Sequence, residues 1–241
     1  RGKARYDGDK ISAAQLEASV GESGNIKIRI SEATNARNIL ITAKNAGAIL
    51  RSLDITDDVV GGILNLQGTF QDDEEDRPLS GDLIINEFHV INAPPLAKLL
   101  TVATLTGALE LLGGQGLPFD KLHAPFVYKN KKISLNKARA SGLSLGLTID
   151  GIIELNDYEV DLNGTIIPAY TINSIVGHVP VIGDILTGGD GQGVFALAYR
   201  ARGPLSDTEI TVNPLTALAP GIFRDLFKLF DRPPTNLEES D

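Results

Sequence analysis

Cysteine is absent from all 241 residues of the sequence, which excludes a disulfide framework and thiolate chemistry. Methionine is absent as well, including an initiator, and we therefore expect an interior fragment or a trimmed chain. A signal peptide or membrane anchor of the parent protein would then lie upstream of Arg1, outside this chain.

Positive charge is scarce relative to negative charge. The chain has 22 Lys and Arg against 31 Asp and Glu, a formal net charge of −9, and no basic stripe is visible along the sequence. This balance argues against nucleic acid as a partner, because phosphate binding needs a cationic face. Hydrophobic residues make up 42% and charged residues 22%, as in folded domains, and the length suffices to bury a core.

Long hydrophobic runs are also missing. A helix needs about 20 apolar residues to span a bilayer, and the run at residues 172–186 is shorter than that. It is also interrupted by five residues: Gly177, His178, Pro180, Gly183 and Asp184. A membrane-spanning helix is therefore excluded there. We expect two short helical turns meeting at Pro180, since proline is favoured at a first helical position.

Most of the chain alternates between apolar and polar residues, which is the pattern of half-buried β-strands. NIKIRI puts Ile26, Ile28 and Ile30 on one face, and ILNLQGTFQ and GVFALAYRARG repeat the pattern. Turn residues separate these segments, including Asn130-Lys131, Asn156-Asp157 and DDEEDRP at residues 72–78. We therefore expect consecutive antiparallel hairpins, a meander with one apolar face.

The cleanest alternation lies in LSLGLTIDG and YEVDLNGTI. A strand sends alternate side chains to one face, so the apolar set of both segments should share the inner face of the sheet. These residues are the candidate lining of an apolar groove: Leu143, Leu145, Leu147, Ile149, Val160 and Leu162.

A helical period occurs in four places: residues 46–53, 94–112, 171–186 and 215–230. The helix over residues 94–112 is apolar around most of its circumference, so it must be buried on several sides or contact lipid. We expect the two middle helical segments to plug or gate one end of the sheet. Their candidate contact residues are Leu96, Leu99, Leu100, Ile175 and Ile182.

The last helix begins at Pro220 and is amphipathic, and Pro233-Pro234 ends it. Its apolar face consists of Ile222, Phe223, Leu226, Phe227 and Phe230. Two roles fit this face: it caps the end of the sheet, or it docks on a membrane surface by apolar insertion. Residues 232–241 are acidic and proline-rich, and we expect them to be disordered.

No motif in the sequence indicates catalysis. GGDGQG at residues 188–193 follows a helix and precedes a strand, the reverse of a nucleotide-binding loop, and it predicts a helix stop. The acidic run at residues 72–76 lacks the spacing of a metal site and predicts a solvated hairpin loop. His89, His123 and His178 stand in no catalytic or metal-binding pattern. We expect a protein that is not an enzyme and has neither cofactor nor metal.

The apolar face allows two interpretations. It can be an ordinary core that the helical insertions cover, or the concave face of an open, curved sheet that holds acyl chains. The pattern of residues alone does not separate the two.

The run TIIPAY to APGIF, at residues 165–223, is similar to the C-terminal region of AsmA-like proteins, closest to the YhdP-type branch. The elements that carry this resemblance are Pro168, Asn173, the turn Gly177-x-x-Pro180-x-x-Gly183, the break at Gly188-Gly189, Gly203-Pro204 and TVNPLTALAPG. The resemblance extends over about residues 45–227, because residues 85–126 and the segments NAGAILRSLDI and GGILNLQGTF are also similar to that family. These motifs are structural and carry no catalytic residues.

The resemblance implies a mainly β fold with helical insertions. Its core would be a curved, taco-like antiparallel β-sheet groove over residues 1–231, with apolar helices near the C-terminal end. Proteins of this family are anchored in the inner membrane of Gram-negative bacteria and extend through the periplasm. The implied function is a non-enzymatic conduit for phospholipid between the inner and outer membranes. Its partners would be phospholipids, a membrane surface and envelope membrane proteins.

Two rival functions come from other classes. The first is a structural or interaction module that supports outer-membrane assembly, with its apolar face filled by its own helices. The second is an envelope hydrolase, which would need a pocket with converging polar groups of perturbed pKa.

Overall fold

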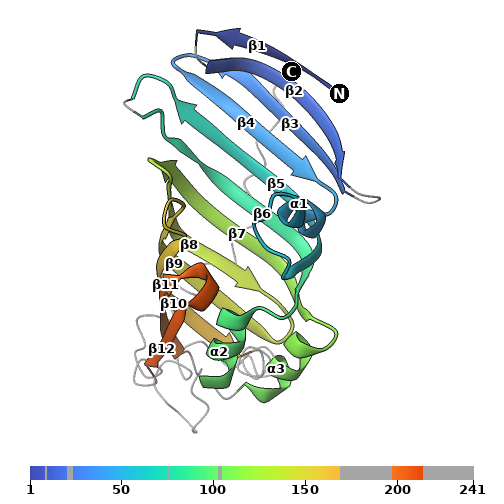
Figure 1. Cartoon of the computed structure of the whole chain (residues 1–241), viewed down its shortest axis with the longest axis vertical. Helices are drawn as coiled ribbons and strands as arrows, with labels where there is room; N and C mark the ends of the chain where they lie inside the picture. Colours follow the sequence, from blue (N-terminus) through green and yellow to red (C-terminus); the bar gives the residue numbers. More distant parts are fainter. Residues whose placement is uncertain (9, 21–23, 75, 103–104, 169–196, 214–241) are drawn as a thin grey trace, which may run out of the picture.

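The computed structural model describes residues 1–8, 10–20, 24–74, 76–102, 105–168 and 197–213. These residues form one open antiparallel sheet of twelve strands, whose order in space is their order in the sequence (Figure 1). The strands are β1 (Gly2–Asp7), β2 (Lys10–Val20), β3 (Gly24–Ala33), β4 (Ala36–Ala43), β5 (Val59–Gln71), β6 (Leu79–Val90), β7 (Leu117–Lys129), β8 (Lys132–Ser141), β9 (Leu145–Glu154), β10 (Glu159–Pro168), β11 (Leu197–Pro204) and β12 (Glu209–Asn213). The predicted mainly β, antiparallel architecture is confirmed.

The predicted turn residues lie where the chain reverses. Asn130 and Lys131 connect β7 to β8 with φ of 51° and 58°. Two successive left-handed residues are typical of a type I′ turn, whose twist matches that of the paired strands. The acidic run follows β5, and Asn156-Asp157 lies between β9 and β10. The strand order is therefore produced by hairpins between sequence neighbours.

Three short α-helices interrupt the described part of the sheet: α1 (Ala46–Ser52), α2 (Pro94–Val102) and α3 (Thr106–Gly113). Helix α1 corresponds to the helix expected at residues 46–53. It begins at Asn45, whose side-chain oxygen accepts a hydrogen bond from the Ala48 amide at 3.0 Å. None of the described helices is long and apolar enough to cross a membrane.

The single helix expected over residues 94–112 is wrong, because the chain forms two helices there. The Thr101 hydroxyl donates to the Ala97 carbonyl at 2.8 Å, a contact that bends and weakens a helix. Thr106 and Gly107, which begin α3, also have low helix propensity. The segment is helical as its apolar period predicts, but Thr101, Thr106 and Gly107 favour two short helices over one long helix.

The strand register gathers apolar residues into continuous rows on one face of the sheet. Residues paired directly across neighbouring strands point to the same face. One row crosses β2 to β11: Ala18, Ile26, Ala43, Leu64, Ile85, Leu122, Ala140, Leu147, Ile166 and Leu197. A second crosses all twelve strands: Ala4, Ala14, Ile30, Ile39, Gly68, Gly81, Phe126, Leu135, Gly151, Leu162, Ala201 and Ile210. We call this side the apolar face.

A bulge in β8 keeps the two halves of that strand in phase with its neighbours. The pairing of β8 with β9 shifts by one residue between Leu135 and Ala138, and its pairing with β7 shifts at the same level. Lys137 adopts a left-handed φ of 56°, and its amide donates to the Asp150 carboxylate at 2.6 Å. Because of the extra residue, Leu135 and Ala138 both lie on the apolar face although they are three positions apart.

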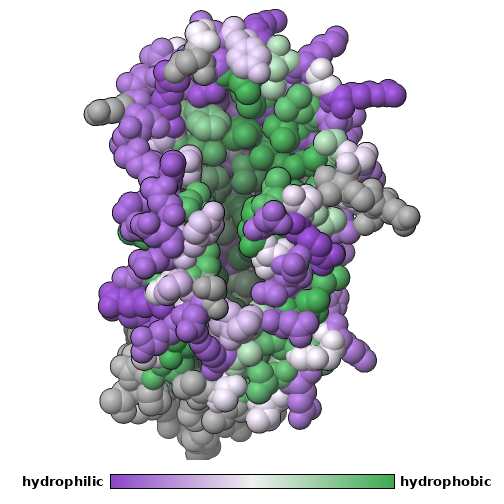
Figure 2. Space-filling model, viewed as in Figure 1, coloured by the Kyte–Doolittle hydropathy of each residue, from purple (hydrophilic) through white to green (hydrophobic). Residues whose placement is uncertain are grey.

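The sheet is curved, and its hollowed side carries a band of apolar side chains flanked by hydrophilic ones (Figure 2). Helix α2 lies across the β12 end of this side (Figure 1). The Lys98 ammonium is 2.9 Å from the Asp207 carboxylate and 3.1 Å from the Thr208 carbonyl oxygen, on the turn that precedes β12. Leu99 and Leu100 are buried beneath the helix. These contacts join residues about 110 positions apart and place α2 against the β12 edge of the sheet.

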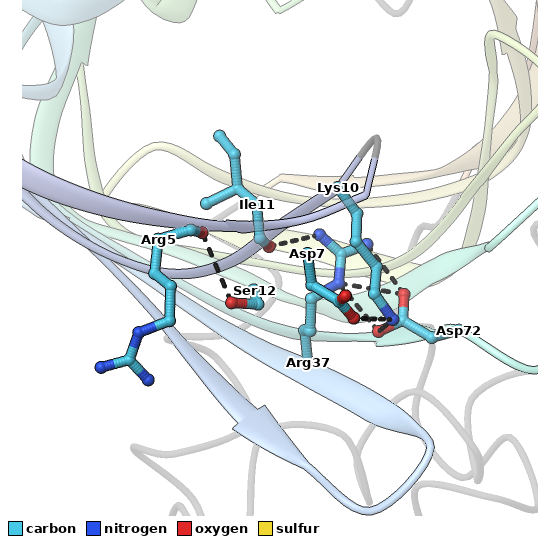
Figure 3. Close-up of polar contacts among 7 residues, drawn as sticks. All are labelled: Arg5, Asp7, Lys10, Ile11, Ser12, Arg37 and Asp72. Carbon is cyan, nitrogen blue, oxygen red and sulfur yellow. Dashed lines mark hydrogen bonds and ion pairs between the residues drawn. The ribbon is translucent and has the colours of Figure 1, made fainter.

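A buried ion pair ties the β1–β2 hairpin to the middle strands (Figure 3). The Arg37 Nε and Nη2 atoms on β4 donate to the Asp72 carboxylate at 2.8–2.9 Å, and Nη1 donates to the Ile11 carbonyl at 2.8 Å. The guanidinium is 4.6 Å from the centre of the Phe70 ring. Lys10 lies 3.7 Å from the same carboxylate. One arginine therefore connects three separate segments at the edge of the apolar face.

This geometry corrects the prediction of a fully solvated loop at residues 72–76. Asp73, Glu74 and Asp76 are exposed, but the Asp72 side chain is only 7% exposed. The hydrogen bonds from Arg37 lower the pKa of Asp72 and outweigh the opposing effect of burial.

We predict that Asp72→Asn lowers the free energy of unfolding by about 3 kcal/mol at pH 7, because Arg37 loses its counter-charge in a buried position. Asp72 is ionised to a lower pH in the native chain than in the unfolded chain. Its contribution is therefore present above about pH 4 and is lost as the pH falls through the native pKa. Urea unfolding from pH 7 to pH 3 should show that the free energies of unfolding of the parent and Asp72→Asn become similar in acid.

The matched control is Asp161→Asn. The Asp161 carboxylate binds Arg200 and Arg202 in solvent, at 3.2 and 2.9 Å, and water and salt screen such exposed pairs. The free energy of unfolding of Asp161→Asn should therefore remain close to that of the parent. Equal losses in the two variants at pH 7 would contradict the role given to burial.

Candidate functional site

The candidate site is the part of the apolar face formed by β3 to β6. Ile26, Ile41, Leu66 and Leu83 are only partly buried there, although they pack against the core. Ile28 extends the same surface and is also half-buried. Exposed apolar surface costs about 25 cal/mol per Å², and a contiguous patch of it usually marks a binding surface.

The same face contains fully buried residues toward β12. Leu117, Leu145 and Ile166 are fully buried, and Leu100 and Leu112 from α2 and α3 belong to the same core cluster. Burial therefore varies within the face rather than from one end to the other. Ala43, Leu64 and Ile85 are buried in one core cluster with Ala46 and Ile49 of α1, whereas Ile26, Ile41, Leu66 and Leu83 on the same strands are only partly buried.

A pair of glycines lies in this part of the face. Gly68 and Gly81 face each other across β5 and β6, between Ile39 and Phe126 in the same row. A Cβ atom on Gly81 would overlap the Gln67 carbonyl oxygen, so the two strands approach closely. The Leu79 side chain occupies the space beside Gly68, where its Cδ1 atom would be 2.8 Å from an added Cβ.

The buried polar groups Tyr199 and Arg37 on the apolar face are paired with other protein groups. The Tyr199 hydroxyl donates to the Thr148 carbonyl at 2.8 Å, and it would contact any Cβ placed on Gly164. Burial, followed by the charge of Asp150, raises the pKa of the Tyr199 phenol, so it stays neutral. Together with the Arg37–Asp72 pair, this leaves a surface that offers mainly hydrocarbon to a ligand.

Five of the six residues predicted to line a groove share the apolar face. Leu147, Ile149 and Leu162 are half-buried, and Leu145 and Val160 are buried. Cross-strand pairing of β9 with β10 brings them together.

The expectation for Leu143 is wrong. β9 begins at Leu145, so Leu143 lies in the β8–β9 connection, and its side chain is 75% exposed. The alternation begins at Leu143 in the sequence, two residues before the chain enters β9 at Leu145. At the neighbouring Gly142 a Cβ would overlap the Pro118 carbonyl oxygen.

Three of the five residues predicted as helix contacts at the end of the sheet lie in the described part of the chain. Leu96, Leu99 and Leu100 lie on α2, with Leu99 and Leu100 buried and Leu96 packed against the core. Several predictions fall outside the described residues: those for Ile175 and Ile182, the glycine-rich run at 188–193, the membrane-docking set Ile222, Phe223, Leu226, Phe227 and Phe230, and the acidic tail at 232–241.

Sequence reasoning did not single out the half-open residues Ile41, Leu66 and Leu83. Their signal was present, since NIKIRI and ILNLQ alternate as clearly as the segments that were chosen. What the sequence did not show is which side chains stay partly exposed beside α1, which packs on β5 and also contacts β2, β3 and β6.

The opposite face holds the nearest approach to a catalytic group. His123 Nε2 is 2.6 Å from Asp82 Oδ1, and Nδ1 is 3.4 Å from the Arg139 guanidinium. In the described part of the chain no hydroxyl is hydrogen-bonded to this histidine, and no cluster of three metal-ligating side chains is present. We find no basis there for a nucleophile or a metal centre.

We predict that Leu147→Asn and Ile152→Asn, two changes on the same strand, differ in their effect. Leu147 packs within the apolar face, so an amide there loses apolar burial and lowers the free energy of unfolding by about 2 kcal/mol. Ile152 lies on the opposite face and is 41% exposed, so the same change should cost little. Thermal and urea unfolding measure both, and equal losses would show that the face assignment is wrong.

We also predict that Gly81→Val strongly destabilises the sheet, since its Cβ has no room beside β5. Gly107→Ala on α3 is the control. Nothing lies within 4 Å of an added Cβ at that position, and alanine favours a helix by about 1 kcal/mol. A tolerated valine at position 81, measured by thermal unfolding, would contradict the close strand approach.

Comparison of this chain with protein families, with characterised proteins and with solved structures found no match. Function therefore has to be inferred from the geometry of the apolar face and from the resemblance noted in the sequence. The feature that carries this inference is a set of partly buried apolar side chains on the hollowed side of an open sheet.

Proposed function

We propose that this protein is a non-enzymatic conduit for phospholipid, with the acyl chains lying along the apolar face. The observation that carries this proposal is the continuity of the apolar rows across neighbouring strands, combined with partial exposure at β3–β6. Ala43, Leu64 and Ile85 on these strands are buried, so the partial exposure is confined to the side chains that α1 does not cover completely.

The dimensions suit a hydrocarbon chain. Strands are spaced about 4.8 Å apart, so the four intervals from β2 to β6 span roughly 19 Å. Half of a bilayer's hydrocarbon core is about 15 Å thick. An acyl chain lying across these strands would contact consecutive members of one row, and each buried CH₂ contributes about 0.8 kcal/mol.

The arrangement supports passage better than tight capture. Tight capture of a lipid needs polar groups that fix its headgroup, whereas Tyr199, Arg37 and Asp72 are occupied by other protein groups. A surface that repeats from strand to strand presents many equivalent positions. A lipid can therefore move between them without losing its apolar contacts.

The finer architecture belongs to the same proposal. The curved sheet would be a groove, with α2 and the helices expected at its C-terminal end closing that end. The parent protein would be periplasmic and anchored in the inner membrane by a segment outside this chain. It would carry lipid between the inner and outer membranes of a Gram-negative envelope. Docking of residues 222–230 on a membrane and contacts with envelope membrane proteins would complete the path.

A second candidate is a structural module for outer-membrane assembly. The observation in its favour is the filled end of the apolar face, where α2 and α3 bury Leu100 and Leu112. Under this hypothesis the half-open strands would hold no lipid.

The test is photo-crosslinking with benzoylphenylalanine at two cross-strand pairs. Ile41 and Leu66 are paired on the apolar face, and Thr42 and Asn65 are paired on the opposite face, one residue away in each strand. Vesicles of phosphatidylethanolamine and phosphatidylglycerol with radiolabelled acyl chains supply the lipid. We expect several-fold more labelled protein from positions 41 and 66 than from 42 and 65.

Equal labelling of both pairs would show non-specific contact with vesicles. No labelling at 41 and 66, in variants whose circular dichroism matches the parent, would favour the structural module. Native mass spectrometry of protein purified from bacteria gives an independent reading through the mass of any bound phospholipid.

A further inference from the structure

Three cations on the face opposite the apolar face lack partners. Lys3, Arg5 and Arg29 are exposed, and none of them forms an ion pair with any residue in the described ranges. Nearby Lys27, by contrast, is paired with Glu17 at 3.2 Å. The chain as a whole has a net charge of −9, so this group of unpaired cations is a positively charged region on an acidic protein.

The register brings these cations together. Lys3 on β1 pairs with Gln15 on β2, and Gln15 pairs with Arg29 on β3, so the three side chains form one cross-strand row. Arg5 lies two residues after Lys3, on the same face. The three cations line a hollow of about 500 Å³, together with Gln15 and Ser31.

This hollow continues into a larger one. Arg29 and Ser31 also line an adjoining hollow of about 930 Å³ that reaches β8. Its polar side chains are mostly neutral amides and hydroxyls: Asn38, Gln67, Thr69, Ser80, Ser134 and Asn136. Asp82, which is paired with His123, lies at the far side. We call the two hollows the trough. Its β1 end is lined by three cations and one acidic residue, Glu32, and the part beyond has Asp82 as its one charged lining residue.

We propose that this trough binds an acidic polypeptide segment in an extended conformation, with its carboxylates at the β1–β3 end. The spacing of the cations supports this occupant. Lys3 and Arg5 are about 7 Å apart along β1, the same separation as alternate side chains of an extended peptide. Lys3 and Arg29 are two strands apart, roughly 10 Å. Several separate carboxylates match this spread better than one phosphate group does.

The shape and chemistry of the trough agree with a peptide. Arginine binds carboxylates through two parallel hydrogen bonds, and neighbouring amides and hydroxyls can bond to a peptide backbone. A flat membrane surface would contact protruding cations rather than cations that line a hollow. The inference does not depend on lipid at the apolar face, since it concerns the opposite side of the sheet.

The test uses a fluorescein-labelled peptide, Gly-Glu-Thr-Glu-Thr-Glu-Gly, and its counterpart with glutamine in place of glutamate. Fluorescence anisotropy at 50 mM NaCl should show binding of the acidic peptide and at least tenfold weaker binding of the neutral one. Arg5→Gln with Arg29→Gln should weaken binding at least tenfold. Lys44→Gln with Lys129→Gln removes the same charge from exposed residues outside the trough and should change binding less than twofold.

Affinity for the acidic peptide should also fall as NaCl is raised to 500 mM, because the contacts are exposed and screened. Equal losses in the two double variants would show attraction by net charge alone and overturn the proposal. Absence of peptide binding would overturn it as well. So would binding of phosphatidylglycerol vesicles that requires Arg5 and Arg29 while the peptide does not bind. Lipid crosslinking at positions 41 and 66 should be unchanged in the double variants, so the two proposals fail separately.

Discussion

An unbroken register across twelve strands is the constraint on which both faces of this protein depend. Side chains alternate along a strand, so a slip of one residue would move the apolar residues of that strand to the other face. The β8 bulge shows how tightly this phase is held: a left-handed Lys137, fixed by Asp150, absorbs one extra residue and returns Ala138 and Ala140 to the apolar rows. The glycine pair in β5 and β6 allows a close approach of these two strands, since a Cβ at Gly81 would overlap the Gln67 carbonyl oxygen.

The two faces use charge differently. On the apolar face, Arg37 and Asp72 are admitted because each satisfies the other, and because the Ile11 carbonyl and the Phe70 ring complete the surroundings of the guanidinium. On the opposite face, solvent makes pairing unnecessary, and Lys3, Arg5 and Arg29 are left available. Burial thus decides where a charge must be neutralised within the chain and where it can serve a partner.

Much of the fold could be predicted from the sequence, because strand alternation and turn residues are local signals. The segments around Ile26, Leu64 and Leu147, the turn at Asn130-Lys131 and helix α1 were all visible in the sequence. Features that depend on distant residues were not. Asp72 looked solvated because its partner Arg37 is 35 residues away. Leu143 belongs to the alternating pattern in the sequence but precedes β9, which begins at Leu145. The cationic trough was hidden for the same reason, since Lys3 and Arg29 become neighbours only through the pairing of three strands.

The strictly sequential strand order makes the length of the sheet an adjustable property. Among the described strands, neighbours in the sequence are neighbours in the sheet. Duplication of one hairpin would lengthen the sheet by roughly 10 Å and continue each apolar row by two residues, while leaving the other pairings intact. Architectures in which each unit contacts only its neighbours gain stability unit by unit and tolerate such insertions. Evolution can therefore change the distance that such a surface covers by the number of hairpins alone, without redesigning its cross-section.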